Sequence, residues 1–350
     1  MFERILIARR GEVAVRIART CKRLGLRSVA LRAEGEEPGD LVDAADDVSV
    51  VPVSEDGRVS PEAIVEVARE TGVDAVHPGY AGDPGHLALA RALEAADVLL
   101  VGMDPDMLEL VAERLALRSA AERAGVRTVP GAEAPVATLS EAYDVAHALG
   151  FPLAVRGGAS LAGARDEEML KDAWERVRET VPEGGLGIER DLPRARRIRV
   201  LIAGDANGEL LPVVDREASV VPEGAVMLEE CPSPELFFRA DGEALREMLF
   251  DASLRLGKEL STAGLVSVDF LVDEEGRGWL DAATLGLPAL HGAIERVTGQ
   301  DLVELQLRLA AGEALPETLR SRAPRGHAFA AAVRSRAGLG EMRFAGAMHV

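Results

Sequence analysis

Apolar residues follow two spacings along the first third of the chain. The short runs RILIA, SVAL, VSVV, DAVHP and VLLVG are rich in aliphatic residues and have the length of buried strands. Between them, apolar residues recur at helical spacing, and Ser60 and Gly72 are placed to begin and end one such helix. Strands that alternate with helices predict a parallel, doubly wound domain over residues 1–112.

A small α+β unit is expected over residues 113–190. The charged, amphipathic segment ERLALRSAAERAGV predicts a helix that bridges to it, and the stretch GAEAPVA is typical of a boundary. The unit itself contains a predicted helix (SEAYDVAHALG), a strand (PLAVR), a Gly/Ala loop (GGASLAGAR) and a second helix (DEEMLKDAWERVRET).

Residues 191–350 are rich in predicted strands. The runs RRIRVLIAG, ELLPVVDRE, AVMLEE, LVSVDFLVD and GWLDAA read as strands, and GDANGE and DEEGRG read as hairpin turns. One long helical stretch, SPELFFRADGEALREMLFDASLRLGKEL, interrupts them. These features predict a third, antiparallel-rich domain.

Composition narrows the possible functions. A net charge of −19 disfavours nucleic-acid binding, because a phosphate backbone would be repelled. The absence of a long uninterrupted apolar run or of a leader pattern predicts a cytoplasmic protein with no membrane span, and Cys21 and Cys231 are expected to be buried, reduced thiols. Only Lys22, Lys171 and Lys258 are lysines, whereas ATP-using ligases normally hold phosphates with lysine.

Several segments resemble the biotin carboxylase family, the ATP-dependent component of acetyl-CoA, propionyl-CoA and pyruvate carboxylases. They are the opening residues MFERILIARRGEVAVRIARTCKRLGLRSVAL and the segments HPGY, AGVRTVPG, GFPLAVR, RLAAGEAL and RGHA. The resemblance covers nearly the whole chain. It implies an ATP-grasp architecture with a doubly wound N-terminal domain, a lid and an antiparallel-rich C-terminal domain.

The resemblance also implies where ATP would bind. Arg114 and Arg156 stand where the family has phosphate-contacting lysines, and the glycine-rich loop that covers the phosphates is reduced to residues 157–164. The implied ATP site comprises Arg114, Arg156, Gly157, Gly158, Gly163 and Glu189. The alternative is an ordinary connecting loop with an incidental arginine.

Two aspartates stand where the family has glutamates that hold Mg²⁺. The carboxylates of Asp269 and Asp281 can bind Mg²⁺, but the aspartate side chain is one methylene group shorter than that of glutamate. ATP with Mg²⁺ is therefore a possible cofactor, although no cofactor is needed for a purely structural role. The alternative is that these are two strand-end aspartates on a solvated edge.

The residues for carboxylation are missing. In VVPEGAVMLEECP, Val226 and Gly224 stand where the family has a lysine and a histidine, although Glu229, Glu230 and Pro232 match. In ATLGLPALHGAIE, only His291 and Glu295 have any claim to match the bicarbonate-binding arginine and glutamate base, and neither is at the base position. The arginine expected after RGHA is absent, with Arg334 nearby but out of register. An apolar lining cannot stabilise the anionic charge of this chemistry, so we expect no catalytic residue.

The first predicted helix contains residues that indicate how this chain would associate with a partner. Arg16 and Arg19 lie where the family forms its homodimer, but Arg23 replaces the acid expected four residues after Arg19. We therefore expect a catalytically inactive, structural or regulatory subunit of an acyl-CoA carboxylase, in a homo- or heterodimer. Its expected partners are a biotin carboxylase subunit or the biotin carrier of fatty acid biosynthesis. The alternative is an ATP-grasp ligase, or an ATP-binding sensor, for another substrate.

Overall fold

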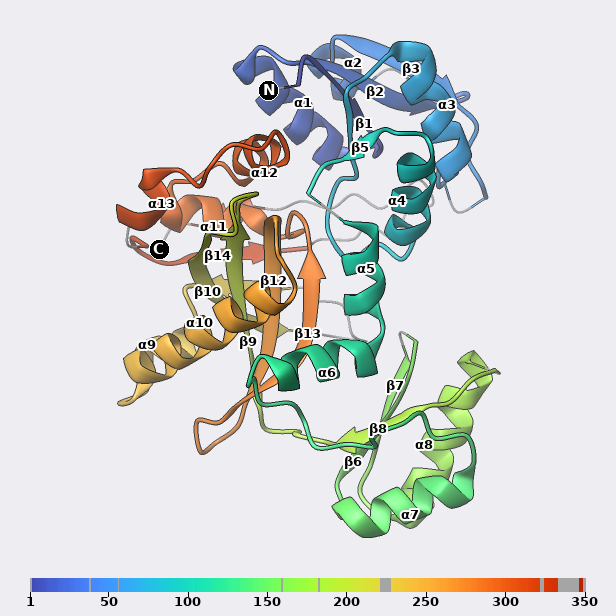
Figure 1. Cartoon of the computed structure of the whole chain (residues 1–350), viewed down its shortest axis with the longest axis vertical. Helices are drawn as coiled ribbons and strands as arrows, with labels where there is room; N and C mark the ends of the chain where they lie inside the picture. Colours follow the sequence, from blue (N-terminus) through green and yellow to red (C-terminus); the bar gives the residue numbers. More distant parts are fainter. Residues whose placement is uncertain are drawn as a thin grey trace.

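The structure, a computed structural model, contains three β-sheets (Figure 1). It describes residues 2–37, 39–55, 57–102, 104–158, 160–181, 183–220, 228–321, 324–332 and 346–348. Within these residues, no helix combines the length and the apolar composition needed to cross a membrane.

The N-terminal sheet is parallel and has helices on both faces. Its strand order is β3-β2-β1-β4-β5, formed by β1 (Arg4–Ile7), β2 (Arg27–Ala33), β3 (Asp47–Val51), β4 (Ala75–His77) and β5 (Leu99–Leu100). The helices are α1 (Glu12–Leu24), α2 (Asp40–Ala44), α3 (Pro61–Thr71) and α4 (His86–Ala95). Ile5 and Ile7 face α1, whereas Leu6 faces α3 and α4. The predicted doubly wound domain is confirmed.

Two helices lead from this domain to the next sheet: α5 (Pro105–Ala112) and α6 (Arg114–Arg123). The apolar side of α6, with Leu117, Ala120 and Ala121, packs in the core of the C-terminal sheet rather than on the lid. Arg114 thus begins a helix that is anchored to the C-terminal domain.

The lid is a three-stranded antiparallel sheet covered by two helices. Its strand order is β7-β6-β8, and it contains α7 (Leu139–Leu149), β6 (Leu153–Gly157), β7 (Ser160–Ala164), α8 (Glu167–Thr180) and β8 (Gly187–Arg190). The predicted Gly/Ala loop is wrong, because residues 160–164 form β7 and pair with β6. Ala162 and Ala164 are buried and Leu161 is exposed, so small residues here serve a tight hairpin rather than an open loop.

The C-terminal sheet has the order β13-β12-β9-β10-β11-β14-β15. Its strands are β9 (Arg196–Gly204), β10 (Leu210–Val220), β11 (Leu228–Cys231), β12 (Gly264–Val272), β13 (Gly278–Leu285), β14 (Ala328–Ala331) and β15 (Gly346–Met348). Both predicted hairpins are confirmed, since β9 pairs with β10 and β12 with β13 in antiparallel register.

The helices of this domain are α9 (Pro234–Phe238), α10 (Gly242–Glu259), α11 (His291–Thr298), α12 (Leu302–Ala310) and α13 (Glu317–Ser321). The expected single long helix is wrong, because the chain turns at residues 239–241 between α9 and α10. Gly242 permits this break, since a Cβ there would lie 2.0 Å from the carbonyl oxygen of Leu236.

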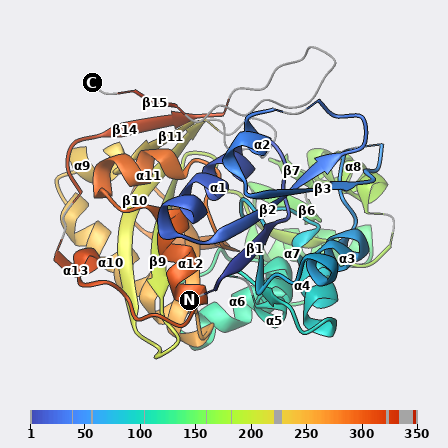
Figure 2. The same ribbon diagram turned by 90° about the horizontal axis from the view of Figure 1, so that it is seen from above.

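Different helices pack on the two faces of the C-terminal sheet. Ile198, Val200 and Ile202 of β9 pack against α10. On the opposite face, Leu201 and Ala203 join the core that includes α1, α11 and α12, and in the view from above α1 lies between the N-terminal and C-terminal sheets (Figure 2). Arg197 and Arg199 lie on the same face as Leu201 and Ala203, and Arg197 shares its partner Asp281 with Arg156 of the lid.

Candidate functional site

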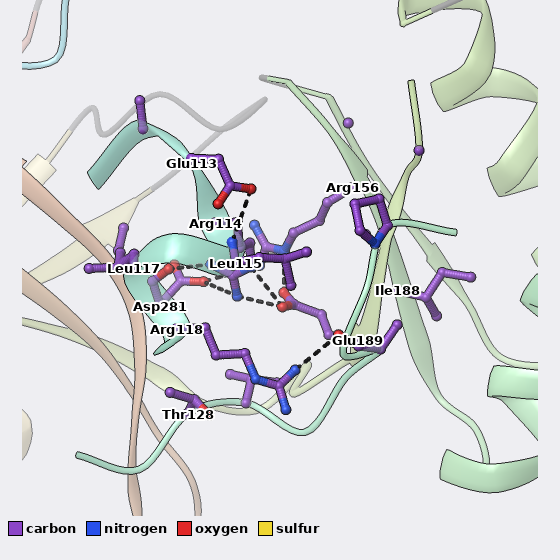
Figure 3. A pocket seen from close by; sticks show the side chains of 18 of the residues that line it. Glu113, Arg114, Leu115, Leu117, Arg118, Thr128, Arg156, Ile188, Glu189 and Asp281 are labelled. Carbon is purple, nitrogen blue, oxygen red and sulfur yellow. Dashed lines mark hydrogen bonds and ion pairs between the residues drawn. The ribbon is translucent and has the colours of Figure 1, made fainter. Parts of the chain in front are cut away.

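A cavity of about 410 Å³ lies between the lid and the C-terminal domain. Its wall is formed by α6, β6, β8, β13 and the segment 128–135, and it includes the side chains of Arg114, Arg156, Glu189 and Asp281 (Figure 3). The structure therefore brings together four of the residues that the sequence assigned to ATP or Mg²⁺.

Arg114 and Arg156 are both bound to Glu189. Arg114 donates from Nε to Oε2 of Glu189 over 2.8 Å, and Arg156 donates from Nε to Oε1. The two guanidinium groups thus share one carboxylate, which projects from β8 of the lid. A phosphate group would have to compete with Glu189 for these donors.

Asp281 links the same arginines to the C-terminal sheet. Arg156 donates from Nη2 to Oδ1 of Asp281 over 3.1 Å, Arg114 Nη2 lies 3.7 Å from that oxygen, and Arg197 donates to Oδ2. Burial alone would raise the pKa of the Asp281 carboxyl, but the charges of Arg197, Arg156 and Arg114 outweigh burial and hold that pKa below its ordinary value. Asp281 is therefore an ionised carboxylate held among three guanidinium groups.

Asp269 is in a similar environment one strand away. Arg199 donates from Nε to Oδ1 over 2.8 Å, and Nη1 of Arg197 lies 3.8 Å from Oδ2. Asp269 and Asp281 are only 5% and 4% exposed, so the alternative of aspartates on a solvated edge is wrong.

The pattern continues along the sheet. Glu229 accepts from Arg199 over 2.6 Å and from Arg216 over 3.1 Å, and Arg216 also donates to the hydroxyl of Ser267. Burial would raise the pKa of Glu229, but Arg216 and Arg199 lower it overall. We call these ion-paired residues the arginine–carboxylate series: Arg114, Arg156, Arg197, Arg199, Arg216, Glu189, Glu229, Asp269 and Asp281.

The sequence reasoning did not find Arg197, Arg199 and Arg216. One signal was present in β9, where Arg197 and Arg199 alternate with Ile198 and Val200. Such alternation places both arginines on one face of the sheet. The partners of these arginines depend on strand register, since Arg199 is opposite both Arg216 and Asp269.

The two metal-binding candidates do not fit Mg²⁺ as they are arranged. Mg²⁺ needs oxygen ligands at about 2.0–2.1 Å in near-octahedral geometry. Each oxygen of Asp281, and each oxygen of Asp269, instead faces a guanidinium nitrogen within hydrogen-bonding or ion-pairing distance. In the part of the chain that the structure describes, no group of three or more His, Cys, Asp or Glu side chains could hold a metal ion.

The expected glycine-rich loop only partly reaches the cavity. Gly157 and Gly158 line it, and a Cβ at Gly157 would lie 2.8 Å from atoms of Leu186 and Val177. Gly163 lies in β7 opposite Ala154 and is not part of the cavity wall. Gly157 therefore has a packing role that requires no ligand.

The segment expected to carry carboxylation chemistry is part of the hydrophobic core. Leu287 and Leu290 are 0% and 6% exposed and pack with Ala293 and Ile294. Burial lowers the pKa of His291 to about 4, and its Nδ1 lies 3.2 Å from the carbonyl oxygen of Pro288. The expected positions Gly224, Val226 and Arg334 lie outside the described residues.

Glu295 and the arginines of α1 are paired within the chain. Arg16 lies 2.8 Å from Glu295 and 2.9 Å from Asp301, and Arg23 lies 2.6 Å from both Asp301 and Glu304. Burial raises the pKa of Glu295 despite its contact with Arg16. Arg19 is exposed on the same helix. Arg23, which replaces the expected acid, thus has acidic partners in its own chain.

Two family profiles match the chain. Residues 1–108 match "Biotin carboxylase, N-terminal domain", and residues 113–318 match "Carbamoyl-phosphate synthase L chain, ATP binding domain". The match to an ATP-binding domain covers the residues of the arginine–carboxylate series and all of the cavity lining except Val111 and Ala112.

Named relatives agree with these profiles. "Biotin carboxylase" of Halalkalibacterium halodurans is 33% identical over 340 residues, which cover 94% of this chain and 74% of that protein. "Biotin carboxylase 2" of Bacillus subtilis is 30% identical over 339 residues, with coverage of 94% and 75%.

A solved structure confirms the expected fold. It is the biotin carboxylase domain dimer of Hydrogenobacter thermophilus 2-oxoglutarate carboxylase, in complex with MgADP, ADP and bicarbonate. Its identity is 27% and its TM-score 0.86, with 95% of this chain and 74% of that chain covered. By sequence and by fold, this chain belongs to the biotin carboxylase family.

Proposed function

We propose that this chain does not catalyse carboxylation and acts as a structural or regulatory subunit of an acyl-CoA carboxylase. The observation that carries the proposal is the burial of Leu287 and Leu290 in the segment where the family places its bicarbonate and base residues. A bicarbonate site needs cations and a base that can exchange protons. In this segment, the only candidate base groups are His291, whose pKa is strongly lowered by burial, and Glu295, which is paired with Arg16.

The cations of the expected ATP site support the same proposal. Arg114 and Arg156 are bound to Glu189 and Asp281, so both phosphate-binding groups are already neutralised within the chain. Phosphoryl transfer depends on cations placed against the phosphate oxygens on which charge develops, whereas these two guanidinium groups are placed against carboxylates. We therefore assign no catalytic residue to this chain.

The direct test is bicarbonate-dependent release of ADP with free biotin and MgATP. We expect no release above the background without bicarbonate. The matched positive control is the Bacillus subtilis relative that is named Biotin carboxylase 2, assayed under the same conditions. Bicarbonate-dependent turnover by this chain would refute the proposal.

The proposed partners are acyl-CoA carboxylase subunits in the cytoplasm, either an active biotin carboxylase or the biotin carrier. Arg23 stands on α1 where the family has an acid, and it is bound to Asp301 and Glu304 of its own chain. The pairing by which the family forms its homodimer is therefore changed, which favours a different partner over a second copy of this chain. Recovery of carboxylase subunits in stoichiometric amounts with the tagged protein would support this assignment, and purification without them would oppose it.

A second candidate function is an ATP-grasp ligase or an ATP-binding sensor that acts on a different substrate. The cavity of about 410 Å³ favours it, because this volume is in the range of small-molecule sites. The ligase would produce ADP or AMP from MgATP in the presence of a cell extract, whereas the sensor would bind ATP without turnover. A lid that stays equally accessible to protease with and without ATP would oppose both.

A further inference from the structure

The lid has a hydrophobic core of its own. The residues that form this core all lie within 132–188, and among the described residues none of them belongs to the cores of the two other sheets. Figure 1 shows the lid apart from those sheets, below α6. We call the two other sheets and their helices the body. Since no apolar core joins the lid to the body, polar contacts must set the position of the lid.

The segment that leads from α6 into the lid is attached to both units. The amide of Leu280 in β13 donates to the carbonyl oxygen of Arg127 over 2.8 Å, and the amide of Arg190 in β8 donates to that of Pro130 over 2.7 Å. These attachments lie close together in the sequence, so they define a hinge on one side of the lid. Whether the lid stays against the body depends on the contacts beyond this hinge.

Four charged side chains meet where the lid faces the body (Figure 3). The lid contributes Arg156 of β6 and Glu189 of β8, and the body contributes Arg114 of α6 and Asp281 of β13. Each unit thus provides one cation and one anion. They pair crosswise, from Arg114 Nε to Glu189 over 2.8 Å and from Arg156 Nη2 to Asp281 over 3.1 Å. We propose that these four residues, the lid latch, hold the lid closed on the body when no ligand is bound.

Burial strengthens the latch, and partial exposure keeps it sensitive to salt. Glu189 and Asp281 are only 7% and 4% exposed, and a buried carboxylate that loses its cations is costly. The side chains of Arg114 and Arg156 are 33% and 25% exposed, so dissolved ions can reach them and screen the pairs.

The latch can open without leaving a buried carboxylate alone. Glu189 would keep Arg156, to which it is bound within the lid, and Asp281 would keep Arg197, to which it is bound within the body. Opening therefore breaks the crosswise pairs while the lid and the body stay folded. Many enzyme lids close on a bound substrate. Here the chain itself provides closing contacts, so the lid takes one position without a ligand.

The experiment is single-molecule fluorescence energy transfer on the full chain without nucleotide. Dyes are attached at Met169→Cys in the lid and Met248→Cys in the body, both 41% exposed, whereas the native Cys21 and Cys231 are 0% exposed. We expect most molecules in one closed state. Raising NaCl from about 0.1 M to about 1 M shortens the screening length from about 10 Å to about 3 Å, and should increase the open fraction roughly threefold or more. An open fraction that is independent of salt would overturn the proposal.

A variant of the lid carboxylate tests the first crosswise pair. Glu189→Gln should increase the open fraction roughly fivefold or more at low salt, because it removes the charge that pairs with Arg114. It should also reduce the response to salt. The matched control is Glu175→Gln, which breaks a surface pair with Lys171 inside α8 and should change neither quantity. Equal open fractions in the two variants would show that other contacts hold the lid.

If circular dichroism shows that Glu189→Gln does not fold, Arg156→Gln tests the second pair, with the same expected result and with the exposed lid residue Arg165, as Arg165→Gln, for a control. The outcomes separate this proposal from the loss of carboxylation. A lid that responds neither to salt nor to these substitutions overturns the latch alone. Bicarbonate-dependent ADP release overturns the loss of carboxylation alone.

Discussion

The expected active site has two ends, the cavity beside the lid and the segment of residues 283–295. The two ends differ in the kind of residue that stands at the family's positions. At the cavity end, charged groups remain, and Arg114, Arg156 and Asp281 are ion-paired with one another or with neighbours. At the other end, Leu287 and Leu290 are part of a continuous hydrophobic core. The cavity end still has charged side chains on its surface, whereas the other end would have to lose part of its core to hold a charged group.

The largest expected effect comes from placing a charge in the apolar end. Leu287→Arg should cost about 5 kcal/mol or more of the free energy of unfolding, because it buries an unpaired guanidinium group. Urea denaturation followed by circular dichroism measures this. Leu161→Arg, at a position that is 55% exposed on the lid, is the control and should change stability by no more than about 0.5 kcal/mol. A stable Leu287→Arg protein would show that this end is not core.

A smaller loss is expected at the charged end. Glu229→Gln leaves Arg199 and Arg216 in a buried site with a neutral partner, which should cost about 3–5 kcal/mol in the same denaturation experiment. The matched control is Glu274→Gln, since Glu274 pairs with Arg194 on the surface and should contribute about 0–1 kcal/mol. Equal effects of the two substitutions would mean that the pairs of Glu229 with Arg199 and Arg216 stabilise the fold no more than a surface ion pair does.

Much of the fold, but only part of this site, follows from the sequence. The alternating strands and helices of residues 1–112 and the two hairpins depend on local spacing, and the structure confirms them. Arg114, Arg156 and Asp281 were found by their position in family segments. The ion pairs of Arg199 with Glu229 and Asp269 could not be predicted, because they depend on which residues are opposite each other in neighbouring strands.

Histidines near the apolar end predict a pH effect of intermediate size. Burial lowers the pKa of His77 to about 3 and that of His291 to about 4, from an ordinary value of about 6.5. As pH falls below 6.5, the unfolded chain takes up protons that the folded chain does not, so stability decreases until the folded pKa is reached. These two groups alone predict a loss of about 2–3 kcal/mol between pH 6 and pH 5, and His86, whose pKa is also lowered by burial, adds to the loss.

Urea denaturation at closely spaced pH values measures this slope. His77→Gln should reduce the slope by about a third to a half, because it removes one of three buried histidines whose pKa is lowered. His147→Gln should leave it unchanged, since the His147 side chain is 71% exposed. If stability stays constant from pH 6 to pH 5, these histidines are not held neutral by burial.

The smallest expected effect tests whether the two ends are independent. The double variant Arg114→Lys and Arg156→Lys restores the residue type that the family uses for phosphates, so it addresses only the cavity end. We expect no gain in bicarbonate-dependent ADP release, because Leu287 and Leu290 still exclude the charged groups that bicarbonate requires. The same assay, with circular dichroism as a check that the double variant is folded, measures the outcome. A gain in release would mean that the replaced lysines alone had abolished carboxylation, and that the apolar segment lies outside the reacting site.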